Sequence, residues 1–195
     1  MTNAIALPFT QDADLMLAVK AGDAACFDIL LARHRGPIVH FIYRMVQNGD
    51  IAEELAQEVF LRVYQSRERY TADAKFTTWL YRIATNRALN WLRDNRRYNE
   101  NESIDTISAD GIRRQLPDPE ISAEGRALRL EVLARIRGAV DSLPDRQRAA
   151  VLMHKYQELD YQQIAAALDC TPQAVKSLLF RAYTALRQSL SGVSV

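Results

Sequence analysis

Two closely spaced helical segments are predicted in the last third of the sequence, and their spacing limits the fold to few possibilities. Asp160 and Gln163 form the Asp-x-x-Gln pattern of a capping box, which predicts the start of a short helix. Thr171 predicts a second N-cap, followed by Pro172 at a first helical position. The apolar residues of the two helices recur at helical spacing: Ile164, Ala165, Leu168, then Val175, Leu178, Leu179, Ala182 and Leu186. With a tight turn at Asp169 and Cys170, this arrangement is typical of a helix-turn-helix.

The second helix of such a motif enters the major groove of DNA and contacts base edges with its first turns. Polar residues fill those positions: Thr171, Gln173, Lys176, Ser177 and Arg181. The alternative is an ordinary helical hairpin whose polar residues are only solvated. Because the caps, the small residues and the polar leading edge coincide in order, the pattern favours sequence-specific DNA binding.

A second candidate DNA-binding surface lies on the helix predicted between Phe76 and Asn95. The whole chain has a net charge of only +1, yet residues 75–97 contain six basic residues and a single acidic one, Asp94. Arg82, Asn86 and Asn90 are four residues apart and therefore share one face, which Arg93 and Arg97 extend. Asn can pair with an adenine edge, and Arg with guanine or phosphate. A solvated polar face is the alternative. Trp79 and Trp91 are interpreted as core residues of the apolar face.

The segment Asp50–Tyr64 predicts an amphipathic helix with an acidic outer face. Ile51, Ala52, Leu55, Ala56, Val59, Phe60, Val63 and Tyr64 recur at the spacing of one buried face, and Asp50 is a candidate N-cap. The opposite face carries Glu53, Glu54, Gln57, Glu58 and Arg62, with Leu61 among them. An exposed leucine surrounded by carboxylates suits a basic protein partner. A solvated charged face is again the alternative.

Composition and periodicity together predict an all-α protein of two small helical domains joined by a flexible acidic linker. The domains span residues 1–98 and 124–195, and the linker spans 99–123, with net charges of +2, +3 and −4 respectively. In the first domain we expect helices near Asp14–Lys20, Ala24–Val46, Asp50–Arg67 and Phe76–Asn95, and in the second three or four helices from about Ala123. The lone Cys26 and Cys170, the absence of a signal-like segment and the lack of a long apolar run predict a soluble, cytoplasmic protein without membrane insertion.

Four sequence blocks, in this order, carry a resemblance to a known family. They are Asp50–Tyr64, the run Phe76–Asn86 (FTTWLYRIATN), the run Leu143–Arg148 (LPDRQR), and Tyr161–Ala165 followed by Ala174–Ser177. The chain resembles the extracytoplasmic-function (ECF) sigma factors of bacterial RNA polymerase, over roughly residues 12–98 and 125–190. In that family the first domain is sigma region 2 and the second is sigma region 4. Asp169 stands where the family usually has glycine, and we expect it to take the left-handed conformation that aspartate tolerates.

The resemblance implies a sigma factor that binds core RNA polymerase and promoter DNA, commonly under the control of an anti-sigma factor. The residues implied to bind the clamp helices of the largest polymerase subunit are Asp50, Glu53, Glu54, Gln57, Glu58 and Leu61. Those implied to bind the minus-ten element are Tyr70, Lys75, Arg82, Asn86, Asn90, Arg93 and Arg97. Those implied to bind the minus-thirty-five element are Thr171, Gln173, Lys176, Ser177 and Arg181.

Two other function classes compete with this interpretation. One is a stand-alone helix-turn-helix repressor or activator, in which the first domain would dimerise or sense a signal. The other is an enzyme, which the sequence disfavours because His34, His40 and His154 lack metal-ligand spacing and neither a phosphate-binding glycine loop nor a nucleophile elbow is found. We therefore expect no catalytic residues, no metal, no cofactor and no small-molecule substrate.

Overall fold

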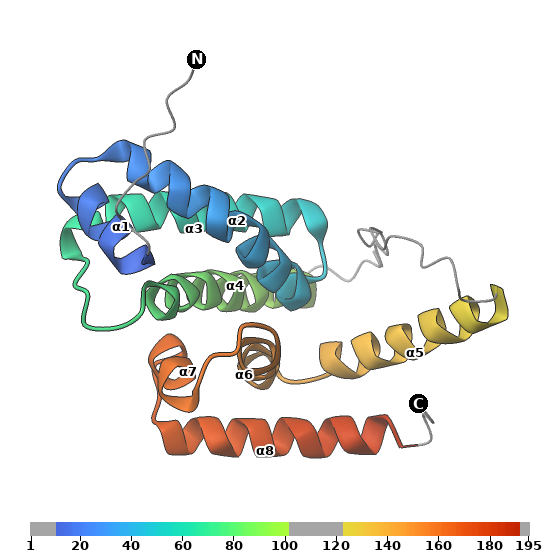
Figure 1. The fold of residues 1–195 in the computed structure, drawn as a ribbon. Coiled ribbons are helices and arrows are strands. Elements are labelled where there is room, and N and C mark those ends of the chain that lie inside the picture. Colours follow the sequence, from blue (N-terminus) through green and yellow to red (C-terminus); the bar gives the residue numbers. More distant parts are fainter. Residues whose placement is uncertain (1–10, 102–122, 192–195) are drawn as a thin grey trace.

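Eight α-helices and one turn of 3-10 helix make up the described part of the protein (Figure 1). The computed structural model describes residues 11–101 and 123–191, with side chains for residues 11–97 and 130–191. Within those residues there is no strand, so the predicted all-α class is confirmed. Most of the predicted acidic linker, residues 102–122, lies outside the described residues.

The first module contains α1 to α4. Its elements are α1 (Asp12–Lys20), α2 (Ala24–Val46), α3 (Gly49–Gln65), the 3-10 turn η1 (Arg67–Arg69) and α4 (Phe76–Asn101). The prediction that Asp50 caps α3 is wrong. The N-cap is Asn48, whose side chain accepts a hydrogen bond from the Ile51 amide at 3.1 Å. Gln47 turns the chain in a left-handed conformation, so only two residues separate α2 from α3, and Asp50 falls in the first turn of α3. A carboxylate there still stabilises α3, because it interacts favourably with the positive N-terminal end of the helix dipole.

The second module contains the predicted helix-turn-helix. Its helices are α5 (Ala123–Asp141), α6 (Asp145–Tyr156), α7 (Tyr161–Leu168) and α8 (Pro172–Ser189). Asp160 and Gln163 form the predicted reciprocal capping box at the start of α7, and the Thr171 hydroxyl caps α8. Asp169 ends α7 in the left-handed conformation, with φ 51° and ψ 58°. Both the predicted motif and the predicted conformation of Asp169 are confirmed.

The inner faces of the helices form most of the predicted core, but the prediction that Tyr64 lies on the buried face of α3 is wrong, because its side chain is exposed. Ala52, Leu55, Ala56, Val59, Phe60 and Val63 of α3 are buried, as are Phe76, Leu80 and Ala84 of α4. Trp79 and Trp91 are half-buried and pack against this core. In the second module Ile164, Ala165, Leu168, Val175, Leu179 and Ala182 are buried. Burial of this kind stabilises helices more than helix propensity does.

The two modules pack against each other along α4. In Figure 1, α4 lies between α2 and α3 on one side and α6 and α7 on the other, and α8 is the outermost helix of the second module. The buried apolar residues of both modules form one continuous cluster. The proposed domain ends at 98 and 124 remain predictions, since α4 continues to Asn101 and α5 begins at Ala123.

The described residues contain neither a membrane-spanning helix nor a cluster of metal-ligating side chains. None of the described helices is both long and apolar enough to cross a membrane. Among the same residues, no three His, Cys, Asp or Glu side chains gather as a metal site would require. Cys26 is buried and Cys170 half-buried, and both are free thiols.

Candidate nucleic-acid interface

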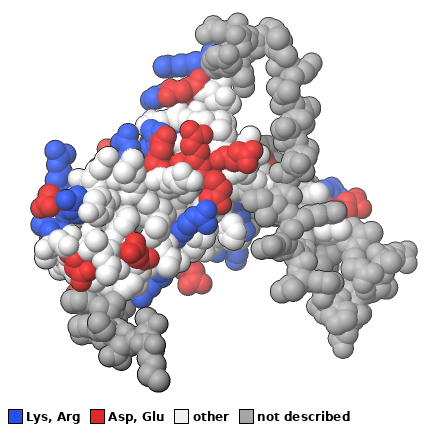
Figure 2. Space-filling model, turned by 90° about the horizontal axis from the view of Figure 1, so that it is seen from above, with Lys and Arg blue, Asp and Glu red and all other residues white. Residues whose placement is uncertain are grey.

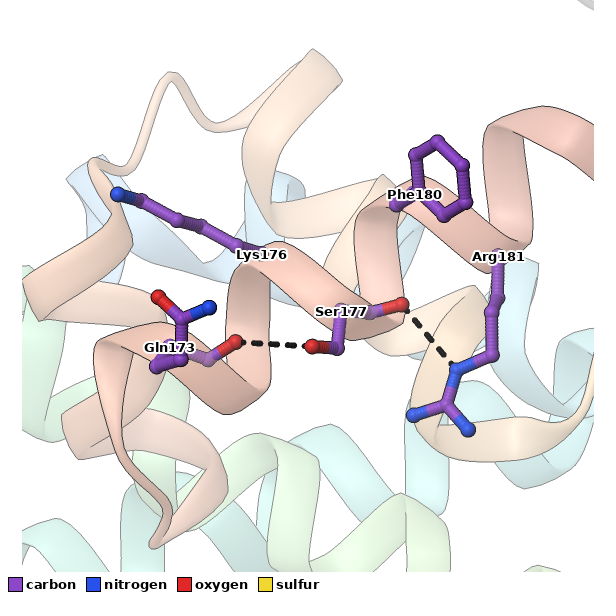
Figure 3. Close-up of a pocket in the computed structure, with 5 residues that line it drawn as sticks. All are labelled: Gln173, Lys176, Ser177, Phe180 and Arg181. Carbon is purple, nitrogen blue, oxygen red and sulfur yellow. Dashed lines mark hydrogen bonds between the residues drawn. The ribbon is translucent and has the colours of Figure 1, made fainter.

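The first turns of α8 present a row of side chains to solvent. Gln173, Lys176, Ser177, Phe180 and Arg181 line a shallow, open hollow of about 550 Å³ (Figure 3). The Ser177 hydroxyl donates to the Gln173 carbonyl at 3.1 Å, and Arg181 Nε donates to the Ser177 carbonyl at 3.2 Å. These bonds leave the Lys176 ammonium and the Gln173 amide free to meet a ligand from outside. Thr171 is exposed, but its hydroxyl already accepts the Ala174 amide at 3.2 Å.

Phe180 was not among the predicted contacts, although it occupies the same face of α8. Its side chain is 73% exposed, the largest value among the large apolar side chains that the structure describes. Position 180 is four residues after Lys176 and three after Ser177, so helical spacing alone could have placed it in the row. A solvent-exposed phenylalanine beside polar residues suits an apolar group on the ligand, such as the methyl group of thymine.

One side of α4 is open to solvent and carries the predicted polar row. Lys75, Arg82, Asn86, Asn90, Arg93 and Arg97 are all exposed. The other side of α4 is buried, with Tyr81, Thr85 and Ala88 at most 3% exposed. Arg93 Nε lies 3.1 Å from Asp94 Oδ1, so its charge is partly compensated by its neighbour. The packing of the modules therefore leaves the predicted DNA-binding face of α4 uncovered.

Tyr70 differs from the other residues predicted to bind the minus-ten element, because its side chain lies in the core. It is 2% exposed, and its ring packs 5.1 Å from Trp79 and 6.2 Å from Phe76 between ring centroids. Burial raises the pKa of its phenol, with Asp12 and Asp14 adding to the shift. Lys20 Nζ donates to the Tyr70 carbonyl at 2.8 Å. Tyr70 thus anchors the loop that leads to Lys75, and its ring is not a surface contact.

Ion pairs occupy two carboxylates on the acidic face of α3, so fewer of its carboxylates are free than the sequence suggests. Arg35 Nη2 lies 2.7 Å from Glu53 Oε2, and Arg87 of α4 forms an ion pair with Glu58. Asp50, Glu54, Gln57 and Leu61 remain exposed, with Leu61 at 57%. Figure 2 shows acidic side chains gathered on the side of the molecule that α2 and α3 form. A partner would therefore meet a row of two unpaired carboxylates and an amide that ends at the apolar side chain of Leu61.

Comparison with known proteins shows which family this chain belongs to. The family model of Sigma-70 region 2 matches residues 30–98, and that of Sigma-70 region 4 matches residues 133–186. The chain is 32% identical to the RNA polymerase sigma-H factor of Pseudomonas aeruginosa over 92% of its own length and 94% of that protein. It is also 32% identical to the ECF RNA polymerase sigma-E factor of Escherichia coli K12, over 90% and 92% of the two chains. The chain belongs to the ECF sigma factors. The resemblance found in the sequence is confirmed.

Two solved structures share the fold of this sigma factor. CnrH, solved in complex with the cytosolic domain of CnrY, is 22% identical and aligns over 94% of this chain and 99% of its own, with a TM-score of 0.68. RpoE of Bartonella quintana, solved with the anti-sigma factor NepR, is 20% identical over 86% and 98% of the chains, also with a TM-score of 0.68. At these identities the likeness concerns the fold.

Proposed function

We propose that this ECF sigma factor docks on core RNA polymerase through α3 and places α4 and α8 on two promoter elements. The observation that carries the proposal is that three separate faces, on α3, α4 and α8, leave the side chains of the family's functional blocks open to solvent. Each face has a chemistry suited to a different partner. Neither DNA recognition nor docking requires a covalent step, so we infer a non-enzymatic protein without a cofactor.

For polymerase docking, the proposed contact centres on Leu61. A leucine that is 57% exposed costs little in the free protein and gains free energy when a partner covers it. Gln57, Glu54 and Asp50 precede it by four, seven and eleven residues and therefore share its face of α3, so a basic partner surface would match the charge of this row. Glu53 and Glu58 are bound to Arg35 and Arg87, and we assign them to orientation of α3 more than to direct contact.

For the minus-ten element, the proposal places bases against Arg82, Asn86 and Asn90 and the phosphate backbone against Lys75, Arg93 and Arg97. The amides and the guanidinium can read base edges, and the flanking cations neutralise phosphates. The loop before Lys75 is held at its start by the buried Tyr70, and residues 71–75 are exposed. A loop of this kind can hold an unstacked base of a separated strand.

For the minus-thirty-five element, the proposal places α8 in the major groove of duplex DNA. Gln173, Lys176, Ser177 and Arg181 are the polar contacts, and Phe180 adds an apolar one. Thr171 contributes mainly by capping α8, because its hydroxyl is engaged with the Ala174 amide. The N-terminus of α8 would also attract a DNA phosphate, because its unpaired backbone N–H groups and the helix dipole favour an anion there.

We also propose an anti-sigma partner that covers these faces when the protein is inactive, as is common in the family. The alternative function is a stand-alone repressor or activator, and footprinting separates the two. The sigma-factor proposal expects protection of both promoter elements only when core polymerase and this chain are present together. Full protection of an operator by the chain alone, as a dimer, would favour the repressor.

A further inference from the structure

The loop between η1 and α4, residues 71–75, is exposed and receives little support from its own backbone. Residues 71–74 make no backbone hydrogen bond to another described residue. The residues on either side of the loop are buried. Tyr70 and Phe76 are each 2% exposed, and their rings lie 6.2 Å apart between centroids. The shape of the loop is therefore set at its two ends.

Helix α1 holds the first end of the loop. Lys20, the last residue of α1, donates from Nζ to the Tyr70 carbonyl at 2.8 Å. Lys20 is half-buried, and a hydrogen bond from a charged donor is about twice as strong as one between neutral groups. The Tyr70 hydroxyl is buried without a hydrogen-bond partner among the described residues. Lys20 thus supplies a polar contact that the Tyr70 side chain does not make.

The opposite end of α1 reaches the second end of the loop through His34 of α2. His34 Nε2 lies 2.8 Å from Oδ2 of Asp12, the first residue of α1. The His34 ring is 9% exposed and packs 5.4 Å from the Phe76 ring, between centroids. Arg33 forms an ion pair with the same carboxylate. Two side chains of α2 therefore fix Asp12, and one of them packs on the first residue of α4.

Both ends of α1 thus act on the same loop. In Figure 1, α1 lies at the end of the first module where the chain passes from η1 to α4, and it packs against both of these elements. A helix keeps its two ends at a fixed separation, so the two contacts cannot move independently. A loop that is already ordered loses less conformational entropy when it binds a ligand.

We infer that Lys20 and the Asp12–His34 pair are positioning residues for the minus-ten element, because through them α1 holds residues 71–75 in one shape. The inference rests on the proposed function, in which this loop receives an unstacked base. Lys20 acts through the Tyr70 carbonyl and does not itself contact DNA. Its loss should therefore weaken the capture of the base and leave the phosphate contacts in place.

The first measurement follows the mobility of the loop in the free chain. A nitroxide label is attached at Asp73→Cys, with Cys26→Ala and Cys170→Ser to remove the native thiols, and its electron paramagnetic resonance line shape is recorded. Lys20→Met removes the donor but keeps an unbranched apolar stem, and it should make the label more mobile. Lys155→Met, at an exposed lysine of α6, should leave the line shape unchanged.

A second variant tests the other end of α1. Asp12→Ala removes the partner of His34 and should also make the label more mobile. Asp28→Ala, at an exposed aspartate of α2, is its matched control and should have no effect on the label. This pair of variants also decides the question if Lys20→Met does not fold.

The second measurement uses unlabelled holoenzyme and a promoter fragment whose minus-ten element is single-stranded. The fragment comes from a promoter that the wild-type holoenzyme selects from a library, and a matched fragment is abasic where base removal weakens wild-type binding most. Lys20→Met should weaken binding of the intact fragment about fivefold and of the abasic fragment by less than about twofold, because loop order matters only when a base is held. The salt dependence of binding should stay unchanged, because no phosphate contact is lost.

Three results would overturn the inference. Unchanged line shapes in both Lys20→Met and Asp12→Ala would show that α1 does not hold the loop. Equal losses on the intact and abasic fragments would show a general effect on folding. A weaker salt dependence in Lys20→Met would assign this lysine to a phosphate. If the wild-type holoenzyme binds every abasic fragment as tightly as the intact one, the proposed base capture is refuted, and the line shapes of the free chain still decide whether α1 orders the loop.

Discussion

The side-chain amide of Gln47, just after α2, donates to Asp141 Oδ1, at the end of α5, over 2.8 Å. Burial raises the pKa of the Asp141 carboxyl above its ordinary value of 3.8, against the opposing influence of Arg148 and Arg137. The packed arrangement therefore binds a proton at Asp141 more tightly than an open one. This contribution to the packing of the two modules is fully present below pH 3.8 and is lost as pH rises through the raised pKa.

We accordingly expect acidic solution to favour the packed arrangement of the two modules. The measurement is the distance between spin labels at Asp28→Cys on α2 and Gln188→Cys on α8, both exposed positions, in a chain that also carries Cys26→Ala and Cys170→Ser, between neutral pH and the onset of acid unfolding. Asp141→Asn removes the titrating group and should flatten the part of the pH dependence that it causes. An unchanged profile in that variant would rule out this role for Asp141.

The capping box at the start of α7 predicts a stability effect. Asp160→Ala leaves the Gln163 amide without its acceptor at 2.8 Å and should lower the free energy of unfolding by about 1 kcal/mol. Gln162→Ala, at an exposed position of the same turn with no capping role, is the matched control and should change stability by less than about 0.5 kcal/mol. Urea denaturation followed by circular dichroism measures both. Equal effects would mean that the cap is not a distinct source of stability.

Leu61 should matter for polymerase binding more than any other exposed leucine. Replacing it by Asp removes an apolar contact of about 1.5–3 kcal/mol and should weaken affinity for core polymerase at least about tenfold. Leu17→Asp is the control, since Leu17 of α1 is also exposed, at 41%, but lies outside the α3 face. Competition binding to purified core enzyme compares the two. Equal losses for both variants would point to a docking surface other than α3.

The polar row on α4 should be needed for promoter opening and not for docking. The Arg82→Ala, Asn86→Ala, Asn90→Ala triple variant should bind core polymerase normally, because α3 is untouched. It should fail to open promoters, since each lost base contact is worth about 1–3 kcal/mol. Permanganate reactivity of unpaired thymines reports opening, with Arg135→Ala on α5 as the control. Normal opening by the triple variant would refute the role of this face.

Phe180 should contribute to recognition through a thymine methyl group. Replacing thymine by deoxyuridine in the minus-thirty-five element removes only that methyl, a change of about 0.8 kcal/mol, or about fourfold in affinity for the wild-type holoenzyme. With Phe180→Ala the same DNA change should have no further effect. Filter binding of holoenzyme to the four protein–DNA combinations measures the coupling. Independent, additive losses would mean that Phe180 does not touch the methyl.

Features that depend on neighbouring residues in the sequence were predictable, and those that depend on packing were less so. The capping box of Asp160 and Gln163 and the turn at Asp169 follow from local hydrogen bonding, and the structure confirms them. The start of α3 was misplaced because Asn48 and Asp50 are both good caps, and only the left-handed turn at Gln47 selects Asn48.

Tertiary contacts explain what the sequence could not reveal about the candidate site. Glu53 and Glu58 look like free carboxylates in the sequence, but α2 and α4 bring Arg35 and Arg87 against them. Tyr70 looks like a loop residue, but an aromatic cluster with Phe76 and Trp79 takes it into the core. Arg148 Nη1 donates to the Met45 carbonyl in the last turn of α2 at 2.7 Å, a contact between residues 103 positions apart that no local pattern encodes.

The most direct test of the account is transcription reconstituted from purified components. Core RNA polymerase, this chain and a library of promoter fragments are combined, and the RNA ends are sequenced. We expect that specific initiation requires both proteins and that the selected promoters share two elements at a fixed spacing. If the chain adds no specific initiation to core polymerase and instead saturates a DNA site by itself, the central claim is contradicted.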